Sequence, residues 1–197
     1  PLEGGRTVVV RRTRAGAIAD VTPAGRDART RVHEYGGGAY GVHRGVVYFA
    51  NFADQRLYRH LPGEEPRPIT PEPPLPAGLR YADFTFGNGF LVSVRERHGE
   101  GEAVNELVRL PLDGSEEPQV IASGHDFFAS PRLSPDGRRL AWLAWDHPDM
   151  PWNGTGLWLA EVDAGGLGST VHGPGDRCQI VHAQRPAATA TGVMVVK

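Results

Sequence analysis

The sequence is poor in residues that define several other classes of protein. It contains one cysteine, Cys178, and one lysine, Lys197, among 197 residues. A single cysteine excludes an internal disulfide. No apolar stretch approaches the roughly 20 residues that a membrane-spanning helix needs. We therefore expect no contact with a membrane and take a cytoplasmic location as the default.

Neither charge nor histidine is concentrated at any point of the chain. The net charge is -2, and the arginines are spread along the sequence instead of forming the basic stripe of a nucleic-acid-binding protein. The eight histidines form no H-x-x-x-H pair and no His/Cys cluster with the spacing of metal ligands. We expect no nucleic-acid partner, no metal and no other cofactor.

The chain does contain a block that recurs three times at a spacing of about 44 to 50 residues, which is typical of propeller blades. Each copy has a strand, a glycine-containing turn, a second strand, a looser connection and a third strand with an aliphatic core. The third strands contain the aligned triplets Leu57-Tyr58-Arg59, Leu107-Val108-Arg109 and Leu157-Trp158-Leu159. A further short strand in each copy gives the four strands of a blade.

Alternating side chains support these strands. Val47 and Phe49 are expected on one face of their strand and Tyr48 and Ala50 on the other. Likewise, Leu140, Trp142 and Ala144 oppose Ala141, Leu143 and Trp145. Two apolar faces suit a sheet packed between two neighbouring sheets. The expected fold class is all-β: a partial β-propeller with about three full four-stranded blades and partial blades at the ends.

We divide the chain into a partial propeller domain, 1–168, and a divergent tail, 169–197. Arg6–Arg12 and the following GAIADVTP are expected to form outer strands of a blade whose start is absent. Because propellers typically need four to eight blades to close, we expect an incomplete propeller. The tail loses the repeat: either a truncated or shifted reading frame produces it, or it forms a divergent strand pair at Gln179–Val181 and Val193–Val196.

Three stretches resemble a known family. They are RTRVHEYGGGAY at 29–40, VYFANFADQRLYR at 47–59 and SGHDFFASPRLSPDGRRLAWLAWDHPDMPWNGTGLW at 123–158. They are similar to the N-terminal propeller of the prolyl oligopeptidase family, within its dipeptidyl-peptidase and acylaminoacyl-peptidase-like branch. The resemblance implies a serine peptidase that cleaves oligopeptides. In it, a propeller of about seven blades gates access to a C-terminal α/β-hydrolase domain carrying a Ser-Asp-His triad.

The chain itself holds no catalytic serine of that kind. A nucleophile elbow requires glycine two positions before and two positions after the serine, and none of the six serines meets this requirement. We therefore assign no catalytic residue and expect the chain alone to be inactive. Its expected partners are the hydrolase domain and peptide substrates.

Two segments are candidates for the substrate channel. The first is His33-Glu34-Tyr35, before a run of three glycines that allows close backbone approach. Glu34 could attract a peptide amino terminus, and the alternative is a structural carboxylate bonded to nearby backbone amides.

The second candidate segment is the proline-stiffened connection that contains Asp146, His147 and Trp152. The resemblance implies that this loop faces the hydrolase domain. The alternative is that Trp152 folds back on its own blade.

Two other functions compete with the peptidase cap. One is a freestanding propeller that binds a protein or another ligand. The other is a propeller enzyme with a metal in its channel, which the absence of a ligand cluster disfavours.

Overall fold

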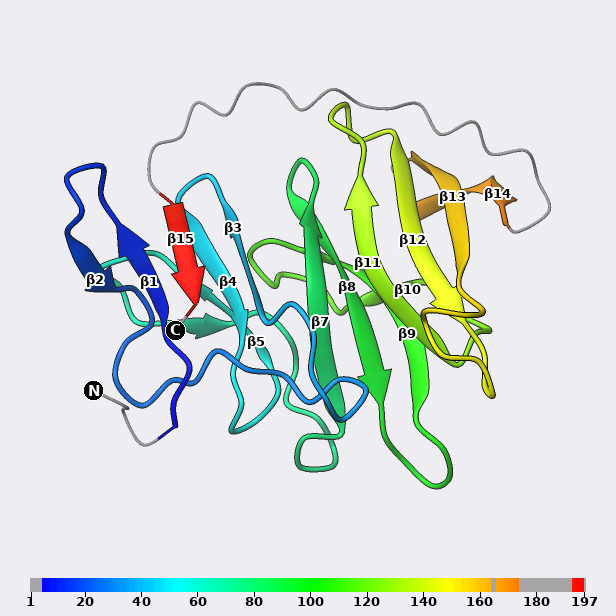
Figure 1. Cartoon of the computed structure of the whole chain (residues 1–197), viewed down its shortest axis with the longest axis horizontal. Helices are drawn as coiled ribbons and strands as arrows, with labels where there is room; N and C mark the ends of the chain where they lie inside the picture. The colour runs from blue at the N-terminus through cyan, green and yellow to red at the C-terminus, as the bar shows by residue number, and fades with distance from the viewer. Residues whose placement is uncertain (1–4, 164–165, 174–192, 197) are drawn as a thin grey trace.

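The computed structural model describes residues 5–163, 166–173 and 193–196, and every regular element in this part of the chain is a strand. The strands form four antiparallel sheets that lie side by side as an open array (Figure 1). The prediction of an all-β partial propeller is confirmed. No helix in the described residues is long and apolar enough to cross a membrane.

Three of the sheets are four-stranded blades in which the strands follow one another in chain order. The first blade comprises β3 (Tyr40–His43), β4 (Val46–Ala50), β5 (Leu57–His60) and β6 (Arg67–Pro68). The second comprises β7 (Leu79–Phe86), β8 (Phe90–Arg97), β9 (Val104–Pro111) and β10 (Gln119–Ala122). The third comprises β11 (Phe127–Leu133), β12 (Arg139–Trp145), β13 (Gly156–Asp163) and β14 (Gly166–His172). These blades correspond to the three sequence repeats.

The fourth sheet joins the two ends of the chain. It contains β1 (Val9–Arg12), β2 (Ile18–Asp20) and β15 (Val193–Val196), with β1 in the middle. The strands expected after Arg6 are thus present as β1 and β2. The expected strand at 193–196 pairs antiparallel with β1, whereas the one at 179–181 lies outside the described residues. The boundary that we placed at position 168 falls within β14.

Side chains alternate between the two faces of β4, as the sequence predicts. Val47 and Phe49 join a cluster shared with the N-terminal sheet, while Tyr48 and Ala50 face the second blade. The turns between first and second strands rely on glycine, because Gly89 and Gly137 have φ of 84° and 71°. This left-handed conformation costs glycine little.

The hydrophobic core lies between the sheets as three clusters. The first, between the N-terminal sheet and the first blade, contains Val9, Ala28, Val47, Phe49 and Tyr58. The second, between the first and second blades, includes Tyr48, Ala50, Leu57, Tyr81, Leu91, Val108 and Leu110. The third, between the second and third blades, includes Val92, Val94, Leu107, Phe128, Leu140, Trp142 and Ala144. Each blade is therefore stabilised mainly by its neighbours.

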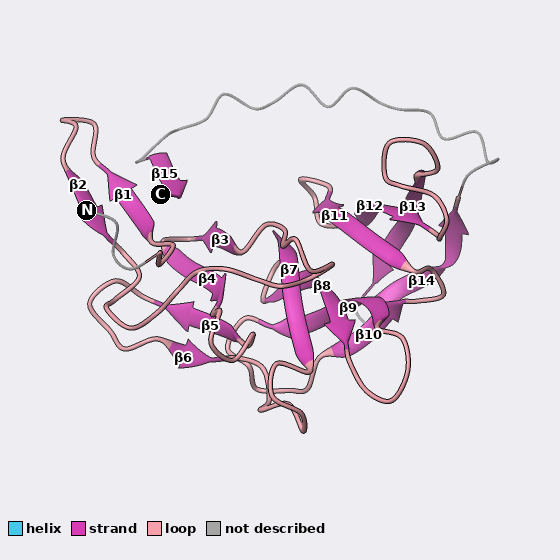
Figure 2. Cartoon of the chain, turned by 60° about the horizontal axis from the view of Figure 1, so that its bottom comes forward, coloured by secondary structure: helices cyan, strands magenta, loops and turns pink. Residues whose placement is uncertain are grey.

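The first strands of the blades meet along one side of the array (Figure 2). Asp83 of β7 connects all three blades there. Its backbone N–H donates to Gly38 O (2.8 Å), its Oδ1 accepts from Gly38 N–H (2.7 Å) and its Oδ2 accepts from Ser130 N–H (2.9 Å). Both β7 and β11 change register at this point. The bulges turn the backbone so that one carboxylate can bridge neighbouring strands.

Candidate functional site

A tight turn before β3 places the first candidate segment. Glu34 N–H donates to Arg31 O (2.9 Å) and Gly36 N–H to Val32 O (2.9 Å). His33 and Glu34 have φ of 55° and 63°, values that few non-glycine residues adopt. The turn projects the side chains of residues 33–35 in different directions.

The glycines after this turn allow the close approach that the sequence predicts. A Cβ added to Gly38 would lie 2.8 Å from Asp83 Oδ1, and one added to Gly37 would lie 3.1 Å from Ala82 Cβ. Side chains at these positions would push β7 away. The glycines therefore hold the 33–35 turn against the second blade.

An arginine fixes the carboxylate of Glu34. Arg80 Nη1 donates to Glu34 Oε1 (2.5 Å), to Glu96 Oε1 (3.0 Å) and to Arg31 O (3.0 Å). Glu96 is buried, with a side chain 4% exposed, whereas that of Glu34 is 76% exposed. Glu34 thus has a partner within the protein, as expected for a structural carboxylate. That partner is the Arg80 guanidinium and not a backbone amide.

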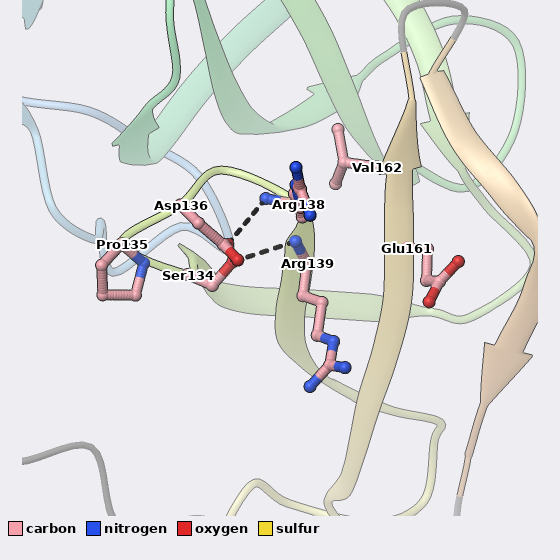
Figure 3. A pocket seen from close by; sticks show the side chains of 7 residues that line it. All are labelled: Ser134, Pro135, Asp136, Arg138, Arg139, Glu161 and Val162. Atoms are coloured by element: carbon pink, nitrogen blue, oxygen red, sulfur yellow. Dashed lines mark hydrogen bonds between the residues drawn. The ribbon is translucent and has the colours of Figure 1, made fainter.

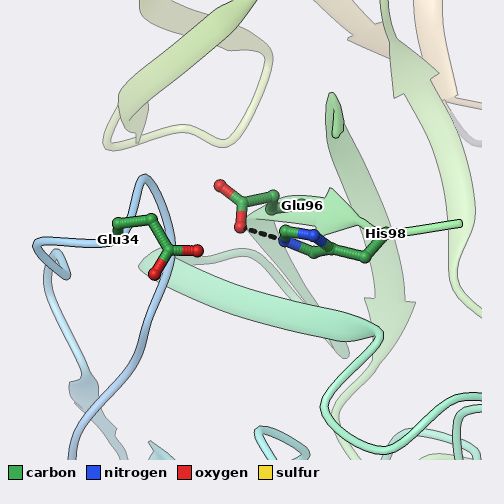
Figure 4. A group of neighbouring side chains, drawn as sticks. All are labelled: Glu34, Glu96 and His98. Carbon is green, nitrogen blue, oxygen red and sulfur yellow. Dashed lines mark hydrogen bonds and ion pairs between the residues drawn. The ribbon is translucent and has the colours of Figure 1, made fainter. Parts of the chain in front are cut away.

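Glu96 is the centre of this charged network. Its Oε2 accepts from His33 N–H (2.7 Å), and its Oε1 also lies 2.5 Å from His98 Nε2 (Figure 4). Three groups, the Arg80 guanidinium, the His33 N–H and the His98 ring, thus converge on Glu34 and Glu96. The bond from Arg80, together with its charge, holds the pKa of Glu34 below its ordinary value.

Glu34, Glu96 and His98 are also close enough to be considered as metal ligands, because their donor atoms all lie within 4.8 Å of one another. Sequence spacing does not reveal this group, since its members come from two distant segments. Arg80, however, already donates to both carboxylates. A divalent cation would have to displace that guanidinium, so the geometry favours an ion-pair network.

His33 lies between this network and a group of aromatic rings. Its ring centroid is 5.2 Å from that of Phe127, 5.7 Å from Tyr35 and 5.9 Å from Trp145. Burial lowers the pKa of His33, although the negative charge of Glu96 opposes the shift. Tyr35, at the edge of the group, is 71% exposed. These rings form an aromatic cluster around His33.

The second candidate segment starts where β12 ends. Asp146 Oδ1 accepts from Asp126 N–H (2.8 Å), and Asp146 Oδ2 lies 2.9 Å from His125 Nδ1. In return, His147 N–H donates to Asp126 Oδ2 (2.9 Å). The bond from the Asp126 N–H and then the bond with His125 lower the pKa of Asp146. Asp146 therefore has a structural partner on the adjoining loop.

The tip of this loop presents apolar surface. Trp152 is 77% exposed, so it does not fold back on its own blade, and Met150 is also exposed. Internal bonds keep the tip ordered: Met150 N–H donates to Asn153 Oδ1 (2.7 Å) and Thr155 Oγ1 donates to Pro151 O (2.6 Å). The ordered tip can present Trp152 to a partner.

The structure brings the two candidate segments to the same end of the sheets. The contact between His33 and Trp145 places the 33–35 turn beside the residue that precedes Asp146. Within the described residues, no bond joins Asp146 or His147 to Glu34. The sequence patterns did not identify Arg80, Glu96 and His98 as site residues. One signal was available, because Glu96 follows Val92 and Val94 on a buried face of β8 and so needs a partner.

Comparison with solved structures shows extended similarity. The chain is 38% identical to puromycin hydrolase with a TM-score of 0.78, over 86% of this chain and 29% of that one. It is also 38% identical, with a TM-score of 0.80, to a mutant of puromycin hydrolase complexed with PGG, over 88% of this chain and 29% of that one.

A third solved relative is a puromycin-hydrolyzing peptidase from Mycobacterium tuberculosis. It is 38% identical with a TM-score of 0.78, over 86% of this chain and 28% of that one. No family model matches the chain, and no curated protein matches it. The chain spans less than a third of the length of these solved relatives.

Proposed function

The chain corresponds to part of the N-terminal propeller of prolyl oligopeptidase-family peptidases, and on this premise we propose that it serves as a non-catalytic cap that gates oligopeptide substrates. One observation carries the proposal: 38% identity over 86% of the chain to a puromycin hydrolase. The sequence has no nucleophile elbow, so bond cleavage would be left to another part of the parent protein. The contribution of the cap is selection of substrates by size and charge.

The end of the sheets that carries the 33–35 turn and Trp152 would face the substrate. Glu34 supports this assignment, because its carboxylate is exposed and remains charged well below neutral pH. Arg80 occupies Oε1, while no described residue donates to Oε2. That oxygen can accept a charge-assisted hydrogen bond from a peptide ammonium group.

This geometry favours a free amino terminus over a blocked one. An acylated amino terminus carries no charge and gains little from Glu34. The exposed ring of Tyr35, the next residue, can offer a cation–π contact to an ammonium group. Within the expected branch, the site thus fits a dipeptidyl-peptidase-like preference better than an acylaminoacyl one.

The loop that carries Met150 and Trp152 is the proposed contact to an α/β-hydrolase domain. Both side chains are exposed on an ordered loop. Such apolar side chains are typical of surfaces that are covered by a partner. His147, which precedes them, would lie at the rim of the same contact.

Peptide binding to the chain tests the proposal. We would titrate it with one short alanine peptide, with its amino terminus either free or acetylated, by isothermal titration calorimetry. The free peptide should bind about fivefold more tightly, and Glu34→Gln should remove the difference. Glu102→Gln, which changes another exposed carboxylate, should have no effect.

Two results would contradict the proposal. The first is equal affinity for the two peptides in the unchanged chain, and the second is a preference that survives Glu34→Gln. Mass spectrometry of the same mixtures should detect no cleaved peptide. Selective binding of folded proteins through Trp152, with no peptide binding, would instead favour the freestanding binding module.

A further inference from the structure

Two asparagines of the chain, Asn88 and Asn153, are each followed by glycine. An Asn-Gly pair can lose ammonia without an enzyme, because the backbone nitrogen of the glycine attacks the side-chain amide carbon and no Cβ hinders the approach. The amide must first turn toward that nitrogen. Hydrogen bonds that hold either group therefore slow the reaction, and the two asparagines differ in these bonds.

Asn153 is held by its own loop. Its Oδ1 accepts from Met150 N–H (2.7 Å), and its Nδ2 donates to Asp149 Oδ1 (3.2 Å). The N–H of Gly154 donates to Met150 O (3.2 Å). Both the amide and the attacking nitrogen are thus engaged, so three hydrogen bonds must break before Asn153 can react.

Asn88 lacks such bonds. It is exposed in the turn between β7 and β8, where Gly87 N–H donates to Phe90 O (2.8 Å). Within the part of the chain that the structure describes, no residue bonds to the Asn88 side chain and none accepts from Gly89 N–H. A Cβ added to Gly89 would meet nothing within 4 Å, so the turn is also uncrowded. The Asn88 amide is therefore able to rotate onto the next backbone nitrogen.

The corresponding turn of the third blade shows how a side chain at such a place can be held. Asp136 lies between β11 and β12 and also precedes a glycine with positive φ. Its Oδ1 accepts from Ser134 Oγ (2.6 Å) and from Arg138 N–H (3.0 Å) (Figure 3). Residues 87–89 contain no hydroxyl side chain. The turn of the second blade thus has no equivalent of the serine that holds Asp136.

We propose that Asn88 is a site of spontaneous deamidation and that Asn153 is protected from the same reaction. The Gly89 nitrogen forms a bond to Cγ of Asn88, the bond from Cγ to Nδ2 breaks, and ammonia leaves with the proton of the attacking nitrogen. Water then opens the cyclic imide at either carbonyl group, which yields aspartate or isoaspartate. Water is the only co-reactant, and no group is oxidised or reduced.

Either product changes the turn. A carboxylate at position 88 joins those of Glu116 and Glu117, which line an open pocket of about 320 Å³ together with Asn88. Isoaspartate also adds one methylene group to the backbone of the turn that sets how β7 pairs with β8. The turn lies at the opposite end of β7 from Arg80. The modification would therefore act on the second blade and not on the Glu34 network.

Peptide mapping by mass spectrometry tests the proposal on the purified chain after incubation at mildly alkaline pH. Replacement of the amide by a carboxyl group changes the peptide mass, and the two asparagines are followed in the same sample. Asn88 should react about 100-fold faster than Asn153, because three hydrogen bonds protect the latter. In concentrated urea these bonds are lost, and the two rates should become equal.

A variant tests the protection directly. Asp149→Ala removes one hydrogen-bond partner of Asn153 and should speed its reaction about fivefold. Glu102→Ala, which removes another exposed carboxylate, is the matched control and should leave both rates unchanged. Circular dichroism would verify that both variants keep their strands.

Two results would overturn the proposal. The first is a rate at Asn88 that does not exceed the rate at Asn153 in the folded chain. The second is a difference between the two asparagines that persists in urea, since the flanking sequence and not the fold would then set the rates. The urea comparison uses the unchanged chain, so it decides the question even if Asp149→Ala does not fold.

Discussion

Asp83 and Ser130 occupy the same point of successive blades, and the carboxylate of Asp83 accepts a hydrogen bond from the backbone N–H of Ser130 at 2.9 Å. Both residues have positive φ, 55° and 52°. The other carboxylate oxygen of Asp83 accepts from Gly38 N–H. A single side chain on β7 thus bonds to β11 and to a residue that lies just before β3, and it does so where β7 and β11 bulge.

Replacing Asp83 should separate these strands. Asp83→Ala would leave two backbone N–H groups without their acceptor and would place alanine in a left-handed conformation, so we expect a loss of about 3 kcal/mol in unfolding free energy. Asp83→Asn keeps one acceptor and should cost about half as much. Urea unfolding followed by circular dichroism measures both. Asp20→Asn, at an exposed position of β2, should match the unchanged chain.

Arg80 should be needed for stability because it neutralises a buried carboxylate. Arg80→Met retains much of the apolar stem but leaves Glu96 without its guanidinium, and the expected cost is about 3 kcal/mol at neutral pH. The comparison variant is Arg67→Met, at an exposed position of β6. Equal unfolding midpoints for the two variants would show that Glu96 does not depend on Arg80.

The pKa of Glu34 should depend on the presence of Arg80. Because its folded pKa is depressed, Glu34 contributes stability above the ordinary glutamate pKa and loses that contribution as the pH falls through the depressed value. Arg80→Met should return the pKa of Glu34 to its ordinary range. Carboxyl chemical shifts measured by NMR across acidic pH give the value directly. An unshifted pKa in the unchanged chain would rule out the Arg80 bond in solution.

His33 should make stability sensitive to mild acid. Burial lowers its pKa, so its contribution is present above the unfolded pKa of about 6.5 and is lost as the pH falls toward the lower folded value. His33→Asn removes the titrating ring and tolerates the positive φ. The variant should show a shallower loss of unfolding free energy below pH 6.5. His147→Asn, at an exposed histidine, should retain the original slope.

Trp152 should matter for contacts and not for folding. Since its side chain is 77% exposed, Trp152→Ser should change the unfolding free energy by no more than about 0.5 kcal/mol. Trp142→Ser, in contrast, empties a core position between two blades and should cost about 4 kcal/mol. Parallel thermal unfolding of the two variants separates these roles. A large effect of Trp152→Ser would mean that the loop packs on its own blade.

The sequence was sufficient to predict the blades but not the bonds between them. Strand period and repeat length place Leu57, Leu107 and Leu157 correctly, because these signals are local or recur at fixed spacing. The exposure of Leu157 could not be predicted from its position in the repeat, since burial depends on what lies beside the sheet. Repeat arrays generally have this property, because each unit contacts only its neighbours.

The candidate site was only partly predictable for a related reason. Local features, namely the glycine run and the loop prolines, identified Glu34 and Trp152. Arg80 and Glu96 were not predicted, because their role depends on how the second blade packs against the turn that precedes the first blade. A charged residue on a buried strand face, such as Glu96, indicates that an oppositely charged partner lies nearby.

The pairing of β1 with β15 can form only after β15 has been synthesised. The ribosome releases β1 long before its neighbour in the sheet, Val193–Val196. Until that neighbour emerges, one edge of β1 keeps backbone groups that can pair with any other extended segment. Between the synthesis of β1 and that of β15 this edge is therefore open to strand exchange, and a chaperone that shields it would favour the correct partner.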